Sequence, residues 1–428
     1  MSFDVPAREW RPRAEALAAA VVATVPEAAG WRDVFADVPR HHFVPTILDD
    51  TGRPLGLSRD TWLDLVYTDD TLLTQTRPIS DGRQWPTSSS TRPSLMARML
   101  AALDLRAGES VLEVGTGTGY NAALLCRKIG DTAVSSLDLD PSLVATAGAR
   151  LAELGHRPHL EAVDGRRGLP DRAPFTRIIA TCAVAAVPAD WCGQLSDGGI
   201  LVADVRGDLE SSLAILSRDE GRLAGHLTGW PGHFMPARDI ADDPLPGGDP
   251  VLRLDKSEPR RAVFAVPTAD LLDDSGFRYV LQFAVPDLLP PMEDESGRVG
   301  VLARDSSWAE VTGGVLFGGP RNLPGLIESA WKRWREAGCP PIDRLGLTIE
   351  VSGRNTLWAD RPDNLVAVRY LVHPVLLGRR ESSGSSRSSV IARSTAVCGT
   401  PTYGAAPAPT ASPGSGLPGV RMTLFTTD

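Results

Sequence analysis

Three glycines follow a short apolar run in the sequence VLEVGTGTGY, residues 111–120. Gly115, Gly117 and Gly119 carry no Cβ atom, so the backbone N–H groups of this turn can lie close to a nucleotide-like ligand. A glycine triad alone is weak evidence, because NAD sites use a similar G-x-G-x-x-G spacing. The G-x-G-x-G spacing found here, with Glu113 shortly before it, favours S-adenosylmethionine over a dinucleotide.

Carboxylates follow the glycine turn at the spacing that an adenosyl ligand requires. Asp138 ends an apolar segment about twenty residues later, where a carboxylate can accept hydrogen bonds from both ribose hydroxyls. Asp164 and Gly165 end the next such segment, where a carboxylate can receive the adenine amino group. A solvated strand end and a turn-forming Asp-Gly pair are the structural alternatives. Thr116 and Glu113 complete the predicted cofactor-binding set. Glu113 is placed near the methionine end of the ligand, with a buried structural carboxylate as the alternative.

Alternating strand and helix patterns are expected to position these side chains. Such alternation is typical of βαβ units, so it predicts an α/β, Rossmann-like fold with a parallel sheet covered by helices on both faces. Further helices are expected at 8–25 and from Pro93 onward, and the polar stretch 49–92 between them has no clear pattern. The strand patterns cover 111–114, 134–140, 159–165, 177–184 and 198–205, and the helical patterns cover 121–130 and 141–155.

The pattern changes after about residue 230, and we therefore expect more than one domain. Strands are predicted at 261–267, 279–286, 299–305, 308–319 and 344–353, with one helix at 324–338. From residue 381 the sequence is rich in Ser, Gly, Pro and Ala, a composition typical of disorder. The predicted division is a catalytic domain (1–230), an α+β domain that is a candidate for substrate recognition (231–380) and a low-complexity tail (381–428).

Composition excludes several classes of protein. The net charge of −9 and the pI near 5.4 argue against a nucleic-acid-binding face. The five cysteines are scattered and form no C-x-x-C pair, which favours reduced thiols in a cytoplasmic protein over disulfides or a metal site. No run approaches the roughly 20 apolar residues that span a bilayer. We expect neither a nucleic-acid nor a membrane partner.

Several segments together resemble the protein-L-isoaspartate O-methyltransferase family. Members of this family methylate aspartyl or isoaspartyl carboxylates of peptides with S-adenosylmethionine, and the resemblance covers about residues 10–205. It implies a peptide substrate held by Asp69, Ser90 and Thr181, with Ser88 and Ser89 as catalytic residues. The segments are VPRHHFVP (38–45), SLMARML (94–100), VLEVGTGTGYNAALL (111–125), VDG (163–165) and APFTRIIATCAVAAVP (173–188).

The chain departs from the repair enzymes of this family in its substrate loop. Tyr67 and Asp69 match the family's Y-x-D motif, but Ser88 lies 19 residues after Asp69, farther than in those enzymes. Serines also replace the Gln and Pro of an I-S-Q-P-like motif. Together with the added C-terminal region, these features resemble a branch encoded beside ATP-grasp ligases in graspetide pathways. That branch methylates one aspartate of a crosslinked ribosomal peptide, and the following backbone nitrogen then displaces methanol to form an aspartimide.

The expected chemistry needs few catalytic groups. A substrate aspartate, with a reference pKa near 4, is ionised at neutral pH and can attack the methyl group without a general base. Catalysis then depends on alignment, with hydroxyls such as that of Ser88 bonding the oxygen that does not attack. The alternative for 87–91 is a helix N-cap cluster. His41 and His42 are expected to have structural roles.

Three other functions remain as alternatives. A general repair enzyme for isoaspartyl proteins would use the same chemistry on many substrates. A non-catalytic module that binds modified peptides is a more distant alternative, because the glycine turn, Glu113 and Asp138 are all present. A dinucleotide-dependent oxidoreductase is the most distant, because of the glycine spacing.

Overall fold

The computed structural model describes residues 5–79, 82–238, 258–312 and 314–370, all of which belong to one compact unit, Met1–Cys398. The predicted tail, 381–428, lies outside the described residues. The N-terminal part is helical, as expected for 8–25. Its elements are α1 (Ala7–Thr24), η1 (Pro26–Trp31), α2 (Arg32–Asp37), α3 (Arg40–Phe43) and α4 (Arg59–Val66).

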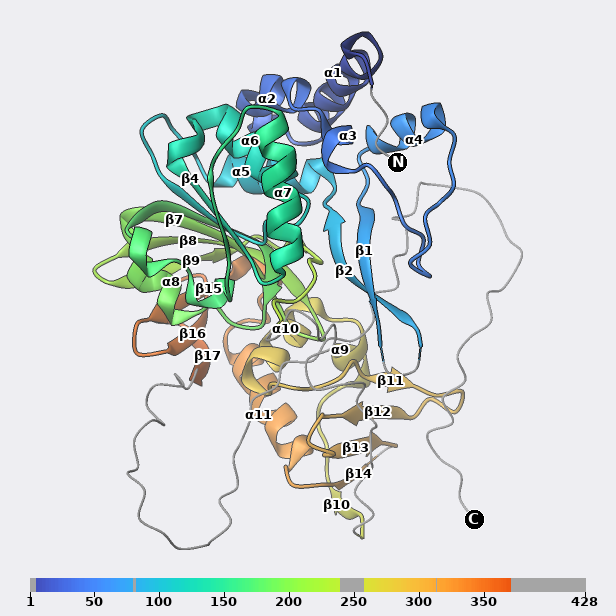
Figure 1. The fold of residues 1–428 in the computed structure, drawn as a ribbon. Coiled ribbons are helices and arrows are strands. Elements are labelled where there is room, and N and C mark those ends of the chain that lie inside the picture. Colours follow the sequence, from blue (N-terminus) through green and yellow to red (C-terminus); the bar gives the residue numbers. More distant parts are fainter. Residues whose placement is uncertain (1–4, 80–81, 239–257, 313, 371–428) are drawn as a thin grey trace, which may run out of the picture. The chain divides into compact units, whose positions relative to one another are not determined.

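Ten strands of the described chain form one mixed sheet (Figure 1), in the order β17-β16-β15-β9-β8-β7-β6-β3-β4-β5. The strands β7, β6, β3, β4 and β5 are parallel, which confirms the predicted α/β fold. Their bounds are β3 (Val111–Val114), β4 (Val134–Asp138), β5 (His159–Ala162), β6 (Phe175–Val184) and β7 (Leu195–Arg206). The antiparallel strands are β8 (Ser211–Asp219), β9 (Arg222–Leu227), β15 (Leu345–Glu350), β16 (Arg354–Ala359) and β17 (Leu365–Tyr370).

Alternate residues of the parallel strands enter two separate cores. Val111 packs into a core with helices α1, α2, α5 and α6, whereas Leu112 and Val114 pack into a second core with α8, α10 and α11. This arrangement explains why both faces of β3 are apolar. The remaining elements of this part are α5 (Pro93–Ala102), α6 (Tyr120–Ile129), η2 (Asp131–Ala133), α7 (Pro141–Glu153), η3 (Gly165–Arg167), η4 (Pro170–Arg172) and α8 (Ala189–Gln194).

The polar stretch 49–92 contains regular structure that the sequence did not reveal. Besides α4, it forms an antiparallel hairpin of β1 (Leu72–Pro78) and β2 (Gln84–Ser90), shown side by side in Figure 1. The hairpin is a two-stranded sheet of its own. The serine run therefore lies at the end of strand β2. The alternative of a helix N-cap cluster is wrong, because the N-cap residue of α5 is Arg92 and its side chain makes no capping hydrogen bond.

A second, antiparallel sheet lies in the C-terminal part, in the order β10-β14-β13-β12-β11. Its strands are β10 (Arg260–Ala262), β11 (Met292–Glu293), β12 (Val299–Leu302), β13 (Trp308–Val311) and β14 (Val315–Gly318). Helices α10 and α11 pack against each other and against β17, and α11 also contacts β13 and β14. The helical elements are α9 (Thr268–Leu272), α10 (Ser275–Ala284), α11 (Leu323–Glu336) and η5 (Ile342–Arg344).

Two predictions for this part have different outcomes. The helix predicted at 324–338 is confirmed as α11, but the strand predicted at 279–286 is wrong, because these residues belong mostly to α10. Phe277, Val280 and Leu281 are buried at helical spacing, and Asp274 caps the helix by accepting a hydrogen bond from the Phe277 N–H. The boundary predicted at residue 230 stays a prediction. Strands β15–β17 lie beyond it and are hydrogen-bonded to the central sheet through β9.

Candidate cofactor and substrate site

The glycine turn between β3 and α6 requires glycine at each position of the triad. Gly115, Gly117 and Gly119 have φ angles of 106°, 52° and 89°, in the region that side chains rarely adopt. A Cβ atom on Gly115 would lie 2.6 Å from the Thr181 hydroxyl oxygen, and one on Gly119 would lie 2.9 Å from the Ala147 Cβ. The backbone can therefore take this path only without side chains.

Glu113 lies directly beneath the turn and is fully buried. Its carboxylate accepts hydrogen bonds from Asn121 Nδ2 at 2.7 Å and Ser136 Oγ at 2.5 Å. Burial raises the pKa of Glu113 to about 7 in spite of these two donors. Thr116 joins the same cluster through a 2.7 Å contact between its hydroxyl and that of Ser136. These hydrogen bonds connect the turn residue Thr116 to β3, β4 and α6. Direct contact of Glu113 with the cofactor stays a prediction.

Asp138, at the end of β4, is tied to the turn by backbone hydrogen bonds. One carboxylate oxygen accepts from Gly117 N at 2.9 Å and the other from Asp140 N at 3.0 Å. Burial raises the pKa of the Asp138 carboxyl group. The carboxylate thus lies at the glycine turn, where we predicted a ribose contact from the spacing alone.

Asp164 and Gly165 lie after β5, and each has close neighbours. Both carboxylate oxygens of Asp164 accept from the Arg166 guanidinium, at 2.9 and 2.8 Å. Burial opposes ionisation, but the Arg166 hydrogen bonds outweigh it, so the pKa of Asp164 lies below its usual value. A Cβ atom on Gly165 would lie only 2.4 Å from Val114 Cγ1, so glycine allows η3 to pack against β3. The predicted adenine contact would share the carboxylate with Arg166.

The serine run of β2 lies over the glycine turn. The hydroxyl oxygen of Ser88 would be 3.6 Å, and the carbonyl oxygen of Ser89 3.9 Å, from a Cβ atom on Gly117. Thr74, on β1, donates a hydrogen bond to the Ser88 hydroxyl at 3.3 Å. Among the described residues, the Ser88 hydroxyl proton has no acceptor of its own. It can therefore be donated to a carboxylate oxygen at this site.

The three predicted substrate-binding residues have structural partners. Asp69 accepts a 2.7 Å hydrogen bond from the Ser94 N–H in the first turn of α5. The Ser90 hydroxyl accepts from Arg40 Nε at 3.3 Å. Thr181 donates to the carbonyl of Gly115 at 2.7 Å and so holds the first turn glycine. The structure brings Thr181 and Ser88 to the same turn, whereas Asp69 anchors the start of α5.

Comparison with known proteins decides the family. The family model described as Protein-L-isoaspartate(D-aspartate) O-methyltransferase matches residues 27–230. A Protein-L-isoaspartate O-methyltransferase 2 from Anaeromyxobacter sp. (strain Fw109-5) is 36% identical over an alignment of 219 residues, and the match covers 49% of this chain and 79% of that protein. A Protein-L-isoaspartate O-methyltransferase from Gloeobacter violaceus is 31% identical over 49% of this chain and 90% of its own length.

The chain belongs to the protein-L-isoaspartate O-methyltransferase family. It is an S-adenosylmethionine-dependent methyltransferase that acts on protein or peptide carboxyl groups. A solved structure of a protein-L-isoaspartate O-methyltransferase has a similar fold, with a TM-score of 0.52 and 21% identity. That similarity covers 81% of this chain and 99% of the other, so it extends well past residue 230.

The methyltransferase has a central arginine that sequence reasoning missed. Arg40 is fully buried, and no carboxylate contacts it within the described chain. Burial lowers the pKa of Arg40 to about 10, so the guanidinium stays charged at neutral pH. It joins the end of α4, the start of β1 and the end of β2. Its hydrogen-bond acceptors are the carbonyls of Val66, Thr68, Asp70, Ser90 and Thr91 and the hydroxyl of Ser90.

The other reactive side chains that we considered are packed. His41 is buried and its Nδ1 lies 2.8 Å from the Tyr67 hydroxyl, while burial lowers its pKa to about 4. His42 Nε2 lies 3.0 Å from the carbonyl oxygen of Arg150. These contacts agree with the structural roles expected for both histidines, which stay a prediction. Burial also raises the pKa of Cys182 to about 12, which keeps the thiol protonated and unsuited to nucleophilic attack.

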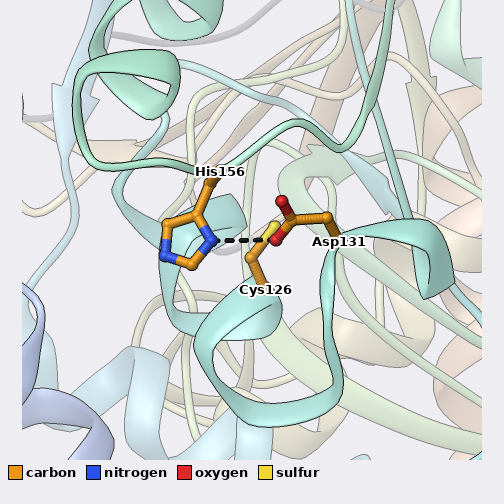
Figure 2. A group of neighbouring side chains, drawn as sticks. All are labelled: Cys126, Asp131 and His156. Atoms are coloured by element: carbon orange, nitrogen blue, oxygen red, sulfur yellow. Dashed lines mark hydrogen bonds and ion pairs between the residues drawn. The ribbon is translucent and has the colours of Figure 1, made fainter.

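Cys126, Asp131 and His156 form a cluster at the opposite end of β4 from the glycine turn. Figure 2 shows the three side chains pointing toward one another. The Asp131 carboxylate already has partners, His156 Nδ1 at 2.8 Å and the Arg157 N–H at 2.6 Å. Burial raises the pKa of Cys126 strongly, whereas a metal ligand must be a thiolate. We therefore interpret the cluster as a hydrogen-bonded anchor for the loops around β4, and the expectation of no metal site stays a prediction.

Within the described chain, no helix has both the length and the apolar character needed to cross a lipid bilayer.

Proposed function

We propose that this methyltransferase esterifies one specific aspartate of a crosslinked ribosomal peptide, which then closes to an aspartimide. The observation that carries the proposal is the position of Ser88, at the end of the long hairpin and beside Gly117. In this proposal, Ser88 and Ser89 contact the reacting carboxylate, and Asp69, Ser90 and Thr181 shape the peptide site. Two departures from the repair enzymes suit a substrate other than a flexible isoaspartyl peptide: serines replace Gln and Pro in the I-S-Q-P-like motif, and the segment from Asp69 to Ser88 is longer.

The proposed cofactor site is the glycine turn with the carboxylates around it. Because the turn glycines carry no side chains, the ligand could approach the backbone closely, and Asp138 would bind the ribose. The whole proposed set is Glu113, Gly115, Thr116, Gly117, Gly119, Asp138, Asp164 and Gly165. S-adenosylmethionine supplies the methyl group, and these residues would orient that methyl group toward the substrate carboxylate.

The proposed reaction has two steps. The ionised aspartate would take the methyl group that S-adenosylmethionine supplies, with the carbon–sulfur bond breaking, to give the methyl ester and S-adenosylhomocysteine. The backbone nitrogen of the next residue then attacks the ester carbonyl, the bond to the methoxy oxygen breaks, and methanol leaves with the nitrogen's proton. The Ser88 hydroxyl would bond the carboxylate oxygen that does not attack, which fixes the orientation of the other.

Two substrates test the proposal. The enzyme is incubated with S-adenosylmethionine and either a precursor peptide crosslinked by an ATP-grasp ligase or a short isoaspartyl peptide. We expect the crosslinked peptide to gain one methyl group and then to lose methanol, as read by mass spectrometry, and the isoaspartyl peptide to react slowly. Efficient methylation of unrelated isoaspartyl peptides, with no reaction of the crosslinked one, would overturn the proposal.

General repair of isoaspartyl proteins is the second candidate. One observation favours it: the structural similarity to a protein-L-isoaspartate O-methyltransferase covers 81% of this chain, so the C-terminal region does not by itself distinguish a specialised branch. The role of 231–380 in substrate recognition therefore stays a proposal, as does a cytoplasmic location. A non-catalytic binding module is no longer a candidate, because the chain belongs to an enzyme family.

A further inference from the structure

Asp140 connects the cofactor side of the site to the substrate hairpin. Its side chain is only 2% exposed. Oδ1 accepts hydrogen bonds from the backbone N–H and the hydroxyl of Ser142, at 2.8 and 2.6 Å, and so caps α7. Oδ2 accepts from two side chains of β1, Gln75 Nε2 at 3.2 Å and Arg77 Nη2 at 3.0 Å. One carboxylate therefore holds two separate elements.

The contacts continue in both directions from Asp140. On the hairpin side, the side-chain Oε1 of Gln75 accepts a 2.8 Å hydrogen bond from the hydroxyl of Thr87, the neighbour of Ser88. On the cofactor side, the Asp140 N–H donates to Asp138, which in turn accepts from the Gly117 N–H. A continuous series of contacts thus joins β2, the strand that carries Ser88, to the glycine turn.

The Asp140 carboxyl group is ionised at neutral pH. Burial opposes its ionisation, but hydrogen bonds from Ser142 and the Arg77 guanidinium outweigh this effect and lower its pKa to about 2. The bond from Arg77 is charge-assisted and therefore stronger than a neutral one. Since a two-stranded hairpin is marginally stable in water, its position depends on such contacts. Arg40 holds the ends of the hairpin nearest the sheet, and Asp140 holds its middle.

We propose that Gln75, Arg77 and Asp140 form a latch that couples cofactor binding at Asp138 to the placement of the hairpin. Gln75 and Arg77 are positioning residues, which act through Asp140 and Thr87. A ligand that orders Asp138 and the glycine turn would order the hairpin through the latch, and by linkage an ordered hairpin would favour the ligand. The inference rests on the proposed role of the hairpin in holding the peptide.

Hydrogen exchange of the full-length enzyme, with and without S-adenosylhomocysteine, tests the latch. In the unmodified enzyme, we expect the ligand to slow exchange of the β2 amides roughly fivefold or more. In Arg77→Met and Gln75→Leu this slowing should be lost, and the affinity for S-adenosylhomocysteine, measured by calorimetry, should fall by no more than about the same factor, as linkage requires. Arg77→Lys, which keeps a cationic donor, should restore part of the effect.

Arg53→Met is the matched control, because Arg53 is exposed and makes no contact with Asp140 in the described structure. It should leave the ligand-dependent slowing intact. The latch would be disproved if the ligand failed to slow β2 exchange in the unmodified enzyme, or slowed it equally in Arg77→Met and Gln75→Leu. No peptide is used, so the result does not depend on whether the enzyme accepts a crosslinked substrate.

Discussion

The hydroxyl oxygen of Ser88 lies 3.6 Å from the position that a Cβ atom on Gly117 would occupy. This contact places the serine run of β2 directly over the turn between β3 and α6. Within the described residues the hairpin does not pair with the central sheet, so its position depends on other contacts, such as those of Arg40 and Asp140. Changes at Ser88 and at Gly117 should therefore affect methyl transfer in different ways.

Replacing Ser88 with alanine should impair catalysis and spare the cofactor. The variant loses a hydroxyl donor for the substrate carboxylate, and one such hydrogen bond to a charged group contributes about 1.5–3 kcal/mol, or about tenfold or more in rate. Methyl transfer to peptide, measured with labelled S-adenosylmethionine, should fall by that factor. The affinity for S-adenosylhomocysteine should stay within a few-fold.

Ser217→Ala is the control for this variant, because Ser217 is an exposed serine on β8. It should leave both quantities unchanged. Equal turnover of Ser88→Ala and the unmodified enzyme would remove Ser88 from the site.

Gly117→Ala should weaken cofactor binding. Its φ of 52° is left-handed, and a side chain there costs about 1–2 kcal/mol. The new methyl group would also lie against Ser88. We expect about a tenfold loss of affinity for S-adenosylhomocysteine by calorimetry. Gly130→Ala strains the backbone at least as much, at φ 87° and ψ 153°, with nothing within 4 Å of the new Cβ, so it should lower stability without changing that affinity. Equal affinity losses in both variants would mean that strain alone is responsible.

The cofactor side of the site could be predicted from the sequence because its signals are local. The glycine triad, the strand before it and the helix after it are contiguous, and Asp138 follows at a spacing typical of doubly wound folds. The sequence allows two roles for Glu113, a cofactor contact or a buried structural carboxylate, and the structure shows that it is buried. What the sequence did not reveal is that Asn121 and Ser136 hold this carboxylate, because their roles depend on how α6 and β4 pack around β3.

The substrate side was harder to predict because its contacts are distant in sequence. Arg40 bonds residues 26 to 51 positions away, and no periodic pattern reports such contacts. The hairpin was missed because its strands are polar, with Gln, Thr and Ser in place of alternating apolar residues. The helix α10 was mistaken for a strand because a short apolar run fits either structure until its partners are known.

Arg40→Met should destabilise the region where the end of α4, the start of β1 and the end of β2 meet. It removes the donors for six acceptors and leaves several buried carbonyl groups unpaired. We expect the free energy of unfolding, measured in urea, to fall by about 3 kcal/mol. Arg40→Lys keeps the charge but not the planar geometry, so it should recover only part of this loss. Arg106→Met, at an exposed arginine, should cause little change, and an equally small change in Arg40→Met would contradict the role assigned to Arg40.

Glu113 should make stability depend on pH. Its pKa rises from an ordinary 4.5 to about 7 on folding, so between these values the folded protein binds more protons than the unfolded one. Stability should therefore fall as pH rises from 4.5 to 7, by about 3 kcal/mol at about 1.4 kcal/mol per pKa unit. Glu113→Gln is neutral at every pH and should remove this slope. Urea unfolding at several pH values measures it, and an unchanged slope in Glu113→Gln would mean that another group is responsible.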